Sequence, residues 1–286
     1  MKRAAAWAAV AVVLLAACGG GGTTKKTAAQ LATTTTGAGE TTTTASGATT
    51  TTAGGGAGAT ATTKAAAKPA TAGAATVNGK PAAGYQPPPG ATPAKPAAPG
   101  TYTYDNSVPA GGTNTFGPPP PTSPLTVDPP NGTVQHSTVT MGSGKTETTL
   151  DYRSDGVHLV EVKIASGPQS FDFVGNPPPL AAPTGVQPGQ SADFTLTSNP
   201  PGTTIQVHID FVRMETITIG GQHVNTMVIH QVGTLAGQLQ GTQTQDAWVS
   251  QQYDLFVQTH QVADVKYGAF SAHSDVMSVL HKLTPA

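Results

Sequence analysis

The chain has 286 residues, with 14 lysine and arginine residues, 15 aspartate and glutamate residues and a formal net charge of −1. This near-neutral balance argues against a nucleic-acid partner, because such a partner requires a basic footprint. The single cysteine excludes a disulfide within the chain, so a folded domain must rely on an apolar core for its stability.

Residues 1–17 have the pattern of a secretory signal peptide. Lys2 and Arg3 form a positive start, and an apolar run of 14 residues follows. The run is too short to span a bilayer, which needs about 20 residues. Leu15-Ala16-Ala17-Cys18 resembles the lipobox of bacterial lipoproteins. The resemblance implies that the thiol of Cys18 carries a diacylglyceryl group and that further acylation strengthens the anchor, since one acyl chain binds a membrane only marginally. The alternative is a plain signal peptide with a chance cysteine.

Residues 18–99 are predicted to be the lipidated cysteine followed by a disordered tether. Between Thr23 and Thr63, 18 of 41 residues are threonine. Such a segment cannot bury enough apolar surface to offset the entropy of ordering it. Between Pro69 and Pro99 repeated prolines favour an extended chain. The tether should have a root-mean-square reach of about 50 Å. Both an O-glycosylated tether and an unmodified spacer agree with this composition.

Residues 100–286 are predicted to form one antiparallel β domain, in which about ten strands are expected. Alternation of apolar and polar residues with period two is typical of half-buried strands. No segment combines a helical period with a cap. In chain order the candidate strand segments are residues 133–141, 146–153, 157–165, 170–174, 192–198, 203–213, 216–219, 223–232, 235–240, 247–252, 255–265 and 275–283.

Two dipeptides predict tight hairpin turns in this domain. Asp155-Gly156 and Gly220-Gly221 each lie between candidate strands, and these residue types tolerate the positive φ of such turns. Strands joined by short turns predict an antiparallel sheet that is curved or closed to limit its edges. The predicted fold class is therefore all-β, with a half-barrel-like sheet.

Several stretches near the C-terminus resemble a family. Residues 213–226 resemble the hairpin of exported bacterial half-barrel proteins, and residues 246–258 and 278–283 resemble the later strands. These patterns are similar to those of the DUF3108-like proteins and, more loosely, of the LolA/LppX-type lipoprotein carriers, over about residues 203–284. The chain departs from the pattern at Val224, where an aromatic residue is usual, and at Phe256, where proline is usual.

The resemblance implies a curved sheet whose concave apolar face binds a lipid or another apolar ligand. An exposed apolar face of this kind must be covered by chain or by ligand. The alternative is that loops near residues 116–130 and 175–190 fill the face. The predicted ligand contacts are Val207, Ile209, Phe211, Ile217, Ile219 and Trp248.

The sequence lacks a recognisable catalytic motif. Residues 142–146 resemble part of a phosphate loop, but Val139 occupies a position that needs glycine, so a hairpin turn is the favoured interpretation. The eight histidines are interpreted as half-exposed sheet residues, although His208 with Asp210, or His223 with His230, would offer metal ligands. Arg213 and Glu215 are interpreted as a cross-strand charge pair. We therefore expect no catalytic residue, metal or cofactor, and no enzymatic activity.

These observations predict an exported lipoprotein with a non-catalytic β domain. It should be anchored through Cys18 to the outer face of the bacterial plasma membrane, or to the outer membrane in a diderm. Expected partners are the membrane and a lipid or apolar ligand, and nucleic acid is not expected. The alternative function is a structural or protein-interaction module with a filled core and an envelope protein as partner.

Overall fold

The computed structural model describes residues 73–115, 117–166 and 169–286. The predicted signal peptide, Cys18 and the tether as far as residue 72 lie outside the described residues. Within the described ranges, no helix is long and apolar enough to cross a membrane.

The described residues contain fifteen β-strands and no helix, which confirms the all-β prediction. The sequence analysis missed β1, β2, β3, β4 and β9, and it divided β11 and β12 into shorter pieces. The strands are β1 (Thr76–Val77), β2 (Lys80–Pro81), β3 (Gly100–Ser107), β4 (Thr122–Val127), β5 (Val134–Met141), β6 (Gly144–Arg153), β7 (Gly156–Ser166), β8 (Gln169–Val174), β9 (Leu180–Pro183), β10 (Ser191–Ser198), β11 (Thr203–Ile219), β12 (Gln222–Gly237), β13 (Leu239–Ser250), β14 (Phe256–Tyr267) and β15 (Phe270–Leu280).

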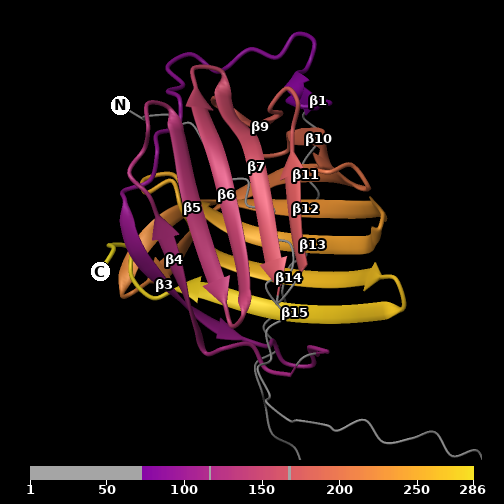
Figure 1. Ribbon diagram of the computed structural model, residues 1–286. Helices are drawn as coiled ribbons and strands as arrows, with labels where there is room; N and C mark the ends of the chain where they lie inside the picture. The colour runs from indigo at the N-terminus through magenta and orange to yellow at the C-terminus, as the bar shows by residue number, and fades with distance from the viewer. Residues whose placement is uncertain (1–72, 116, 167–168) are drawn as a thin grey trace, which may run out of the picture. The chain divides into compact units, whose positions relative to one another are not determined.

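Twelve of these strands form one closed antiparallel sheet. The strand order is β6-β5-β4-β3-β15-β14-β13-β12-β11-β10-β8-β7, and β6 also pairs with β7, which completes the ring. β9 pairs with β7, and β1 and β2 form a separate pair. In Figure 1, β5, β6 and β7 form a front layer that runs steeply across β12–β15 behind it. The predicted curved sheet is therefore confirmed, and it closes into a barrel rather than remaining an open half-barrel.

The turn predictions hold, with one shift of register. Gly220 and Gly221 have φ values of 54° and 80°, and Ile219 pairs with Gln222 on either side of them. At the other predicted turn, Arg153 pairs with Gly156, so the two loop residues are Ser154 and Asp155 rather than Asp155 and Gly156. Residues 142–146 contain the β5–β6 turn, in which Met141 pairs with Gly144. The hairpin interpretation of the phosphate-loop-like stretch is confirmed.

A bulge divides the long strand β11 into two parts. The pairing with β12 shifts between Phe211 and Arg213. Because a shift of one residue exchanges the two faces of a strand, the apolar residues before and after the bulge serve different parts of the core. Residues before it belong to a large cluster between the two layers, and Ile217 and Ile219 pack with a second cluster that includes Tyr102, Leu255 and Leu280.

The folded domain begins before the predicted boundary at residue 99. Ala75 and Thr76 are fully buried, and Ala97 is also buried. The backbone N–H of Ala75 donates to the carbonyl oxygen of Ser191 at 2.7 Å. Small side chains let this segment lie close to β10, so a composition typical of a linker is also suited to packing. The tether prediction is therefore corrected for residues 74–98.

Candidate functional site

Three of the predicted ligand contacts lie in the large core cluster. Val207, Ile209 and Phe211 are 2%, 0% and 3% exposed, and they pack among apolar side chains from β6, β7, β8, β12 and β13. Because the sheet is closed, the face that the sequence analysis expected to be concave and open faces the interior. The protein's own side chains bury these three residues.

The other three predicted contacts lie around the second cluster. Ile219 is buried there, and Ile217 and Trp248 are partly buried against it. Trp248 Nε1–H donates to Glu215 Oε2 at 3.2 Å, and Arg213 Nη2 lies 2.7 Å from the same oxygen. Arg213 and Glu215 therefore pair along one strand, not across strands as predicted. The structure divides the six predicted residues between two clusters, and their role as ligand contacts stays a prediction.

The interior also contains buried amide side chains. Gln231 and Gln245 are Cα partners on β12 and β13, and each is 2% exposed. Gln231 Nε2, both amide atoms of Gln245 and Thr146 Oγ1 are buried without a hydrogen-bond partner in the described part of the chain. An unsatisfied buried polar atom costs about 1–3 kcal/mol, so water or another polar group is the suitable neighbour for these atoms. This part of the interior is polar, unlike a pocket for acyl chains.

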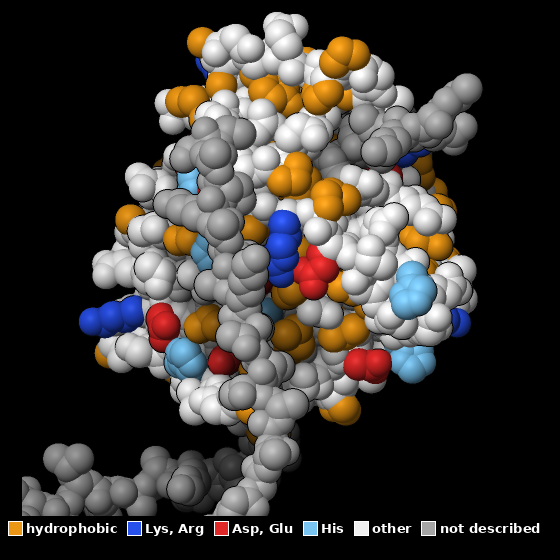
Figure 2. Space-filling model, turned by 180° about the vertical axis from the view of Figure 1, so that it is seen from behind, with side chains coloured by type: hydrophobic (Ala, Val, Ile, Leu, Met, Phe, Trp, Pro, Cys, Tyr) orange, Lys and Arg blue, Asp and Glu red, His pale blue; other side chains and the backbone are white. Residues whose placement is uncertain are grey.

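Histidine–aspartate pairs recur across the described residues. Seven of the eight histidines lie within 3.0 Å of an aspartate carboxylate. Figure 2, which views the molecule from behind over β12–β15, shows histidine side chains beside acidic ones. The pairs are His136–Asp128, His158–Asp155, His208–Asp193, His230–Asp246, His260–Asp275, His273–Asp264 and His281–Asp105.

His208 lies between two carboxylates on the outer surface. Its Nδ1 is 2.6 Å from Asp193 Oδ1, and its Nε2 is 3.3 Å from Asp210 Oδ1. Burial lowers the pKa of His208, but the hydrogen bond and charge of Asp193 and the charge of Asp210 outweigh this effect, so the pKa is raised. Both ring nitrogens can donate when the ring is protonated, which matches two acceptors.

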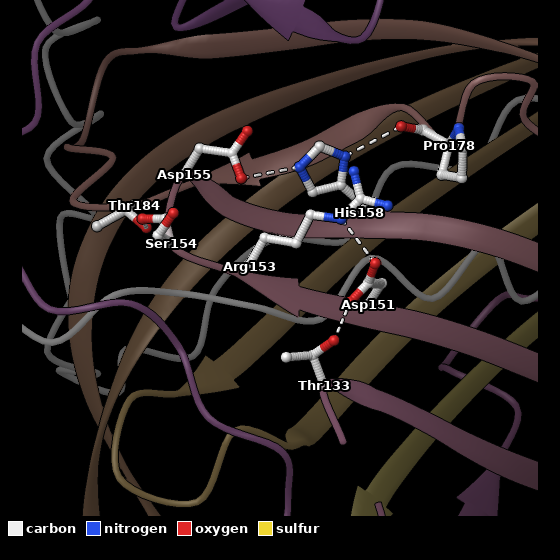
Figure 3. Close-up of polar contacts among 8 residues, drawn as sticks. All are labelled: Thr133, Asp151, Arg153, Ser154, Asp155, His158, Pro178 and Thr184. Carbon is white, nitrogen blue, oxygen red and sulfur yellow. Dashed lines mark hydrogen bonds and ion pairs between the residues drawn. The ribbon is translucent and has the colours of Figure 1, made fainter. Parts of the chain in front are cut away.

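A polar cluster, in which His158 and Asp151 are buried and Arg153 and Asp155 are exposed, surrounds the β6–β7 turn (Figure 3). The ring of His158 is held at both nitrogens, by Asp155 Oδ1 at 3.0 Å and by the carbonyl oxygen of Pro178 at 3.0 Å. Asp151 accepts from Thr133 and from Arg153, each at 2.6 Å. Burial raises the pKa of Asp151, but these two donors and the charge of Arg153 outweigh it and leave the pKa lowered.

Thr184 completes the connection between this turn and the segment after β9. The Oγ1 of Thr184 donates to the carbonyl oxygen of Ser154 at 3.0 Å. Its backbone N–H donates to the carbonyl oxygen of Asp155 at 2.8 Å. These contacts tie the turn to neighbouring loops. Because both nitrogens of His158 have oxygen partners, the ring helps to position the turn.

Asp254 is a second unusual group, in the turn between β13 and β14. Its φ is 52°, in the left-handed region, and its Oδ1 is buried without a hydrogen-bond partner in the described structure. Burial raises the pKa of Asp254 to about 7, although the backbone N–H and the charge of Lys95 act in the opposite direction. Burial and the charge of Asp254 together raise the pKa of Tyr152. Burial thus brings the change of charge of Asp254 close to neutral pH.

The described residues do not include a grouping of three or more His, Cys, Asp or Glu side chains that would hold a metal ion. His208 and Asp210 lie together, as one of the two metal-ligand alternatives requires. His223 and His230 are seven residues apart on β12, about 23 Å along the strand, and so cannot share an ion.

Sequence reasoning missed the histidine–aspartate pairs because they depend on strand register. The spacing of His208 and Asp210, two residues apart, was a signal that both lie on one face of a strand. Of the seven histidine–aspartate pairs, only His158–Asp155 is three residues apart, and the others join residues that are eight or more positions apart in the chain. Their assignment required knowing which residues lie opposite one another.

No protein-family model matches the chain, and no curated protein matches it. The structure is similar to a protein of YmcC-like fold from Bacteroides fragilis, assigned as exported, with 14% identity over 67% of this chain and 98% of that chain and a TM-score of 0.34. It is also similar to a protein from Parabacteroides distasonis, assigned as a lipoprotein, with 13% identity over 67% of this chain and 98% of that chain and a TM-score of 0.38.

The DUF3108-like or LolA-type resemblance stays a prediction.

Proposed function

We propose that this chain is an exported, lipid-anchored, non-catalytic protein of the bacterial cell envelope whose β domain is an interaction module with a filled core. The observation that supports a filled core is the burial of Val207, Ile209 and Phe211 inside the closed sheet. A face that is already covered by the chain has no apolar surface left to be covered by a ligand. The lipobox-like sequence ending at Cys18 supports the anchor.

Recognition of a partner would then use the outer surface. The histidine–aspartate pairs outside the barrel are rich in donors and acceptors, and the pairs of His208 and His230 are half-exposed. The absence of catalysis is part of the proposal. Both ring nitrogens of His158 and of His208 lie against carboxylate or carbonyl oxygens. This arrangement supports the proposal, because it leaves these two rings unsuited to activating a hydroxyl nucleophile.

Native mass spectrometry of the mature chain, residues 18–286 with Cys18→Ser and purified without detergent, tests the filled core. We expect the mass of the polypeptide alone and no binding of an apolar dye. A discrete additional mass that organic solvent removes and identifies as lipid would refute the filled core and support the predicted lipid or apolar ligand.

The variant Ile209→Ala distinguishes the two roles of this residue. If Ile209 belongs to a filled core, the variant should lose about 2–5 kcal/mol of stability. If Ile209 lines a ligand site, the variant should fold with nearly unchanged stability and lose ligand. Ile217→Ala, at a partly buried position, is the matched control and should lose less.

The anchor is tested separately in cells. The wild-type protein should fractionate with membranes, and its N-terminal peptide should carry acyl groups on Cys18. The Cys18→Ser variant should lack both properties. Recovery of this variant in membranes with an unchanged distribution would contradict lipid anchoring.

A further inference from the structure

The outward-facing charged side chains of β10–β15 form a surface that we call the rear face. Six carboxylates, two cations and four histidines lie on it, so its net charge is −4 when the histidines are neutral and zero when all four are protonated. None of these twelve side chains is fully buried. They are Asp193, Asp210, Glu215, Asp246, Asp264, Asp275, Arg213, Lys266, His208, His230, His260 and His273.

Four of these residues form a straight row across four neighbouring strands. The row is defined by direct Cα pairing of Asp210 with His230, of His230 with Asp246, and of Asp246 with His260. The four side chains are 51%, 40%, 44% and 30% exposed in that order. Residues that are directly paired in this way lie on the same face of the sheet. When the histidines are protonated, the charges along the row alternate, beginning with a negative charge and ending with a positive one.

We propose that the rear face is a self-association surface on which a second copy of this chain docks when the histidines are protonated. An alternating row with an even number of charges is complementary to itself under a two-fold rotation. If the axis lies in the interface, perpendicular to the row at its centre, Asp210 meets His260 of the second copy and His230 meets Asp246 of the second copy. This is the isologous arrangement of a two-fold dimer, in which each contact occurs twice.

The charge of the rear face explains why acid should be required. With neutral histidines, two copies would bring together surfaces of net charge −4, and like charges placed opposite one another are destabilising. Protonation removes the net charge and also supplies the positive members of the row. Individual exposed ion pairs contribute little, so the attraction must come from the repeated pairs together with the loss of repulsion.

The second copy is favoured over other occupants by the charges on the rear face. A polyanion would be repelled at neutral pH and would meet a face of zero net charge in acid. A polycation would find carboxylates that already accept from histidine, such as Asp193 from His208 and Asp246 from His230. The alternating row is matched best by another alternating row, and this chain itself carries one.

Other charged groups lie around the row. His208, between Asp193 and Asp210, has a raised pKa for the reasons given above. The loop at residues 108–115 packs on β15, where the backbone N–H of Thr115 donates to the carbonyl oxygen of His273 at 2.9 Å, and it carries no charged residue. The other charged groups on the strands of the row and on the strands beside it are, in chain order, Asp193 on β10, His208, Arg213 and Glu215 on β11, His223 on β12, Asp264 and Lys266 on β14, and His273 and Asp275 on β15. On β3, Asp105 pairs with His281.

The proposal goes beyond the interaction module proposed above, because it requires neither the lipid nor a filled core. The test uses the mature chain with Cys18→Ser, so that acyl chains cannot drive association. Sedimentation equilibrium is measured at about pH 5 and about pH 8, which bracket the titration of histidine, at one ionic strength. We expect a dimer at pH 5 with a dissociation constant at least tenfold lower than at pH 8.

Two double variants assign the dimer to the row. His230→Gln/His260→Gln removes the positive members and should be monomeric at both pH values. His136→Gln/His281→Gln removes two histidine–aspartate pairs that lie off the rear face, and it should dimerise like the parent. Circular dichroism at both pH values verifies that each variant is folded.

A third variant keeps the proposal testable if the glutamine variant does not fold. His230→Lys/His260→Lys makes the positive charges permanent, so it should dimerise at pH 8 as well as at pH 5. A parent chain that remains monomeric at pH 5 would overturn the proposal. So would a dimer that the row variants do not affect, equal affinity at both pH values, or open-ended polymers in place of a dimer.

Discussion

Replacing Asp254 by asparagine should stabilise the protein at neutral and alkaline pH and leave its stability almost unchanged in acid. Burial raises the pKa of this carboxyl group from 3.8 to about 7, against the opposing effect of Lys95. Asparagine resembles the protonated carboxyl group in shape and also tolerates the positive φ at this position. The substitution should therefore remove the buried charge without straining the turn.

The sign and size follow from proton linkage. Between pH 4 and pH 7 the folded state binds the proton of Asp254 more tightly than the unfolded state does. The free energy of unfolding therefore falls as the pH rises through this range and levels off above it. A pKa difference of about three units, at 1.36 kcal/mol per unit, corresponds to at most about 4 kcal/mol. The asparagine variant should lack this dependence and exceed the wild type by up to that amount at pH 8.

Urea denaturation of both proteins at intervals between about pH 4 and about pH 8 measures the effect. The control is Asp264→Asn, whose side chain is 66% exposed and whose pair with His273 is expected to contribute less than about 1 kcal/mol. Equal stability of wild type and Asp254→Asn at every pH would refute the argument. A difference that does not change with pH would refute it as well, because it would point to packing rather than to charge.

Three further predictions concern the surface, the interior and a turn. Because the pKa of His208 is raised, the stability from its pair with Asp193 should be present at pH 5.5 and disappear as the pH rises through that pKa. The His208→Gln variant should thus be less stable than wild type in acid by under about 1 kcal/mol, and thermal melts should converge near pH 8. Gln231→Met should be neutral or stabilising by about 1 kcal/mol in urea denaturation, because it removes a buried amide nitrogen that has no hydrogen-bond partner in the described structure; a clear loss would indicate bound water. Gly156→Ala should lose more than about 2 kcal/mol, because φ is 144° and the added Cβ would clash with the carbonyl oxygen of Ala182; an unchanged melting temperature would contradict this.

Local patterns in the sequence predicted the strands and turns that depend on neighbouring residues. Alternation of Ile205, Val207, Ile209 and Phe211 correctly identified a buried face, because the side chains of a strand alternate whatever lies on either side. Gly220 and Gly221 identified a turn, because few residues adopt its positive φ values.

The same patterns failed where the partner of a residue decided the outcome. The small residues around Ala75 were interpreted as a linker, since nothing in their composition indicates that β10 lies beside them. The bulge after Phe211 was missed, so Ile217 and Ile219 were assigned to the same face as Ile209. The candidate ligand site was predicted as one surface and is found in two clusters.

The sequence by itself determined that this is an all-β domain built from alternating strands and tight turns, because those features arise within a few residues. It also indicated a lipid anchor at Cys18, because the lipobox-like pattern is contiguous. Only the tertiary structure decided that β6 pairs with β7 and closes the sheet, and that the outer histidines lie beside aspartates. Closure and cross-strand register depend on pairing between residues far apart in the chain, and period-two alternation does not specify which strands will meet.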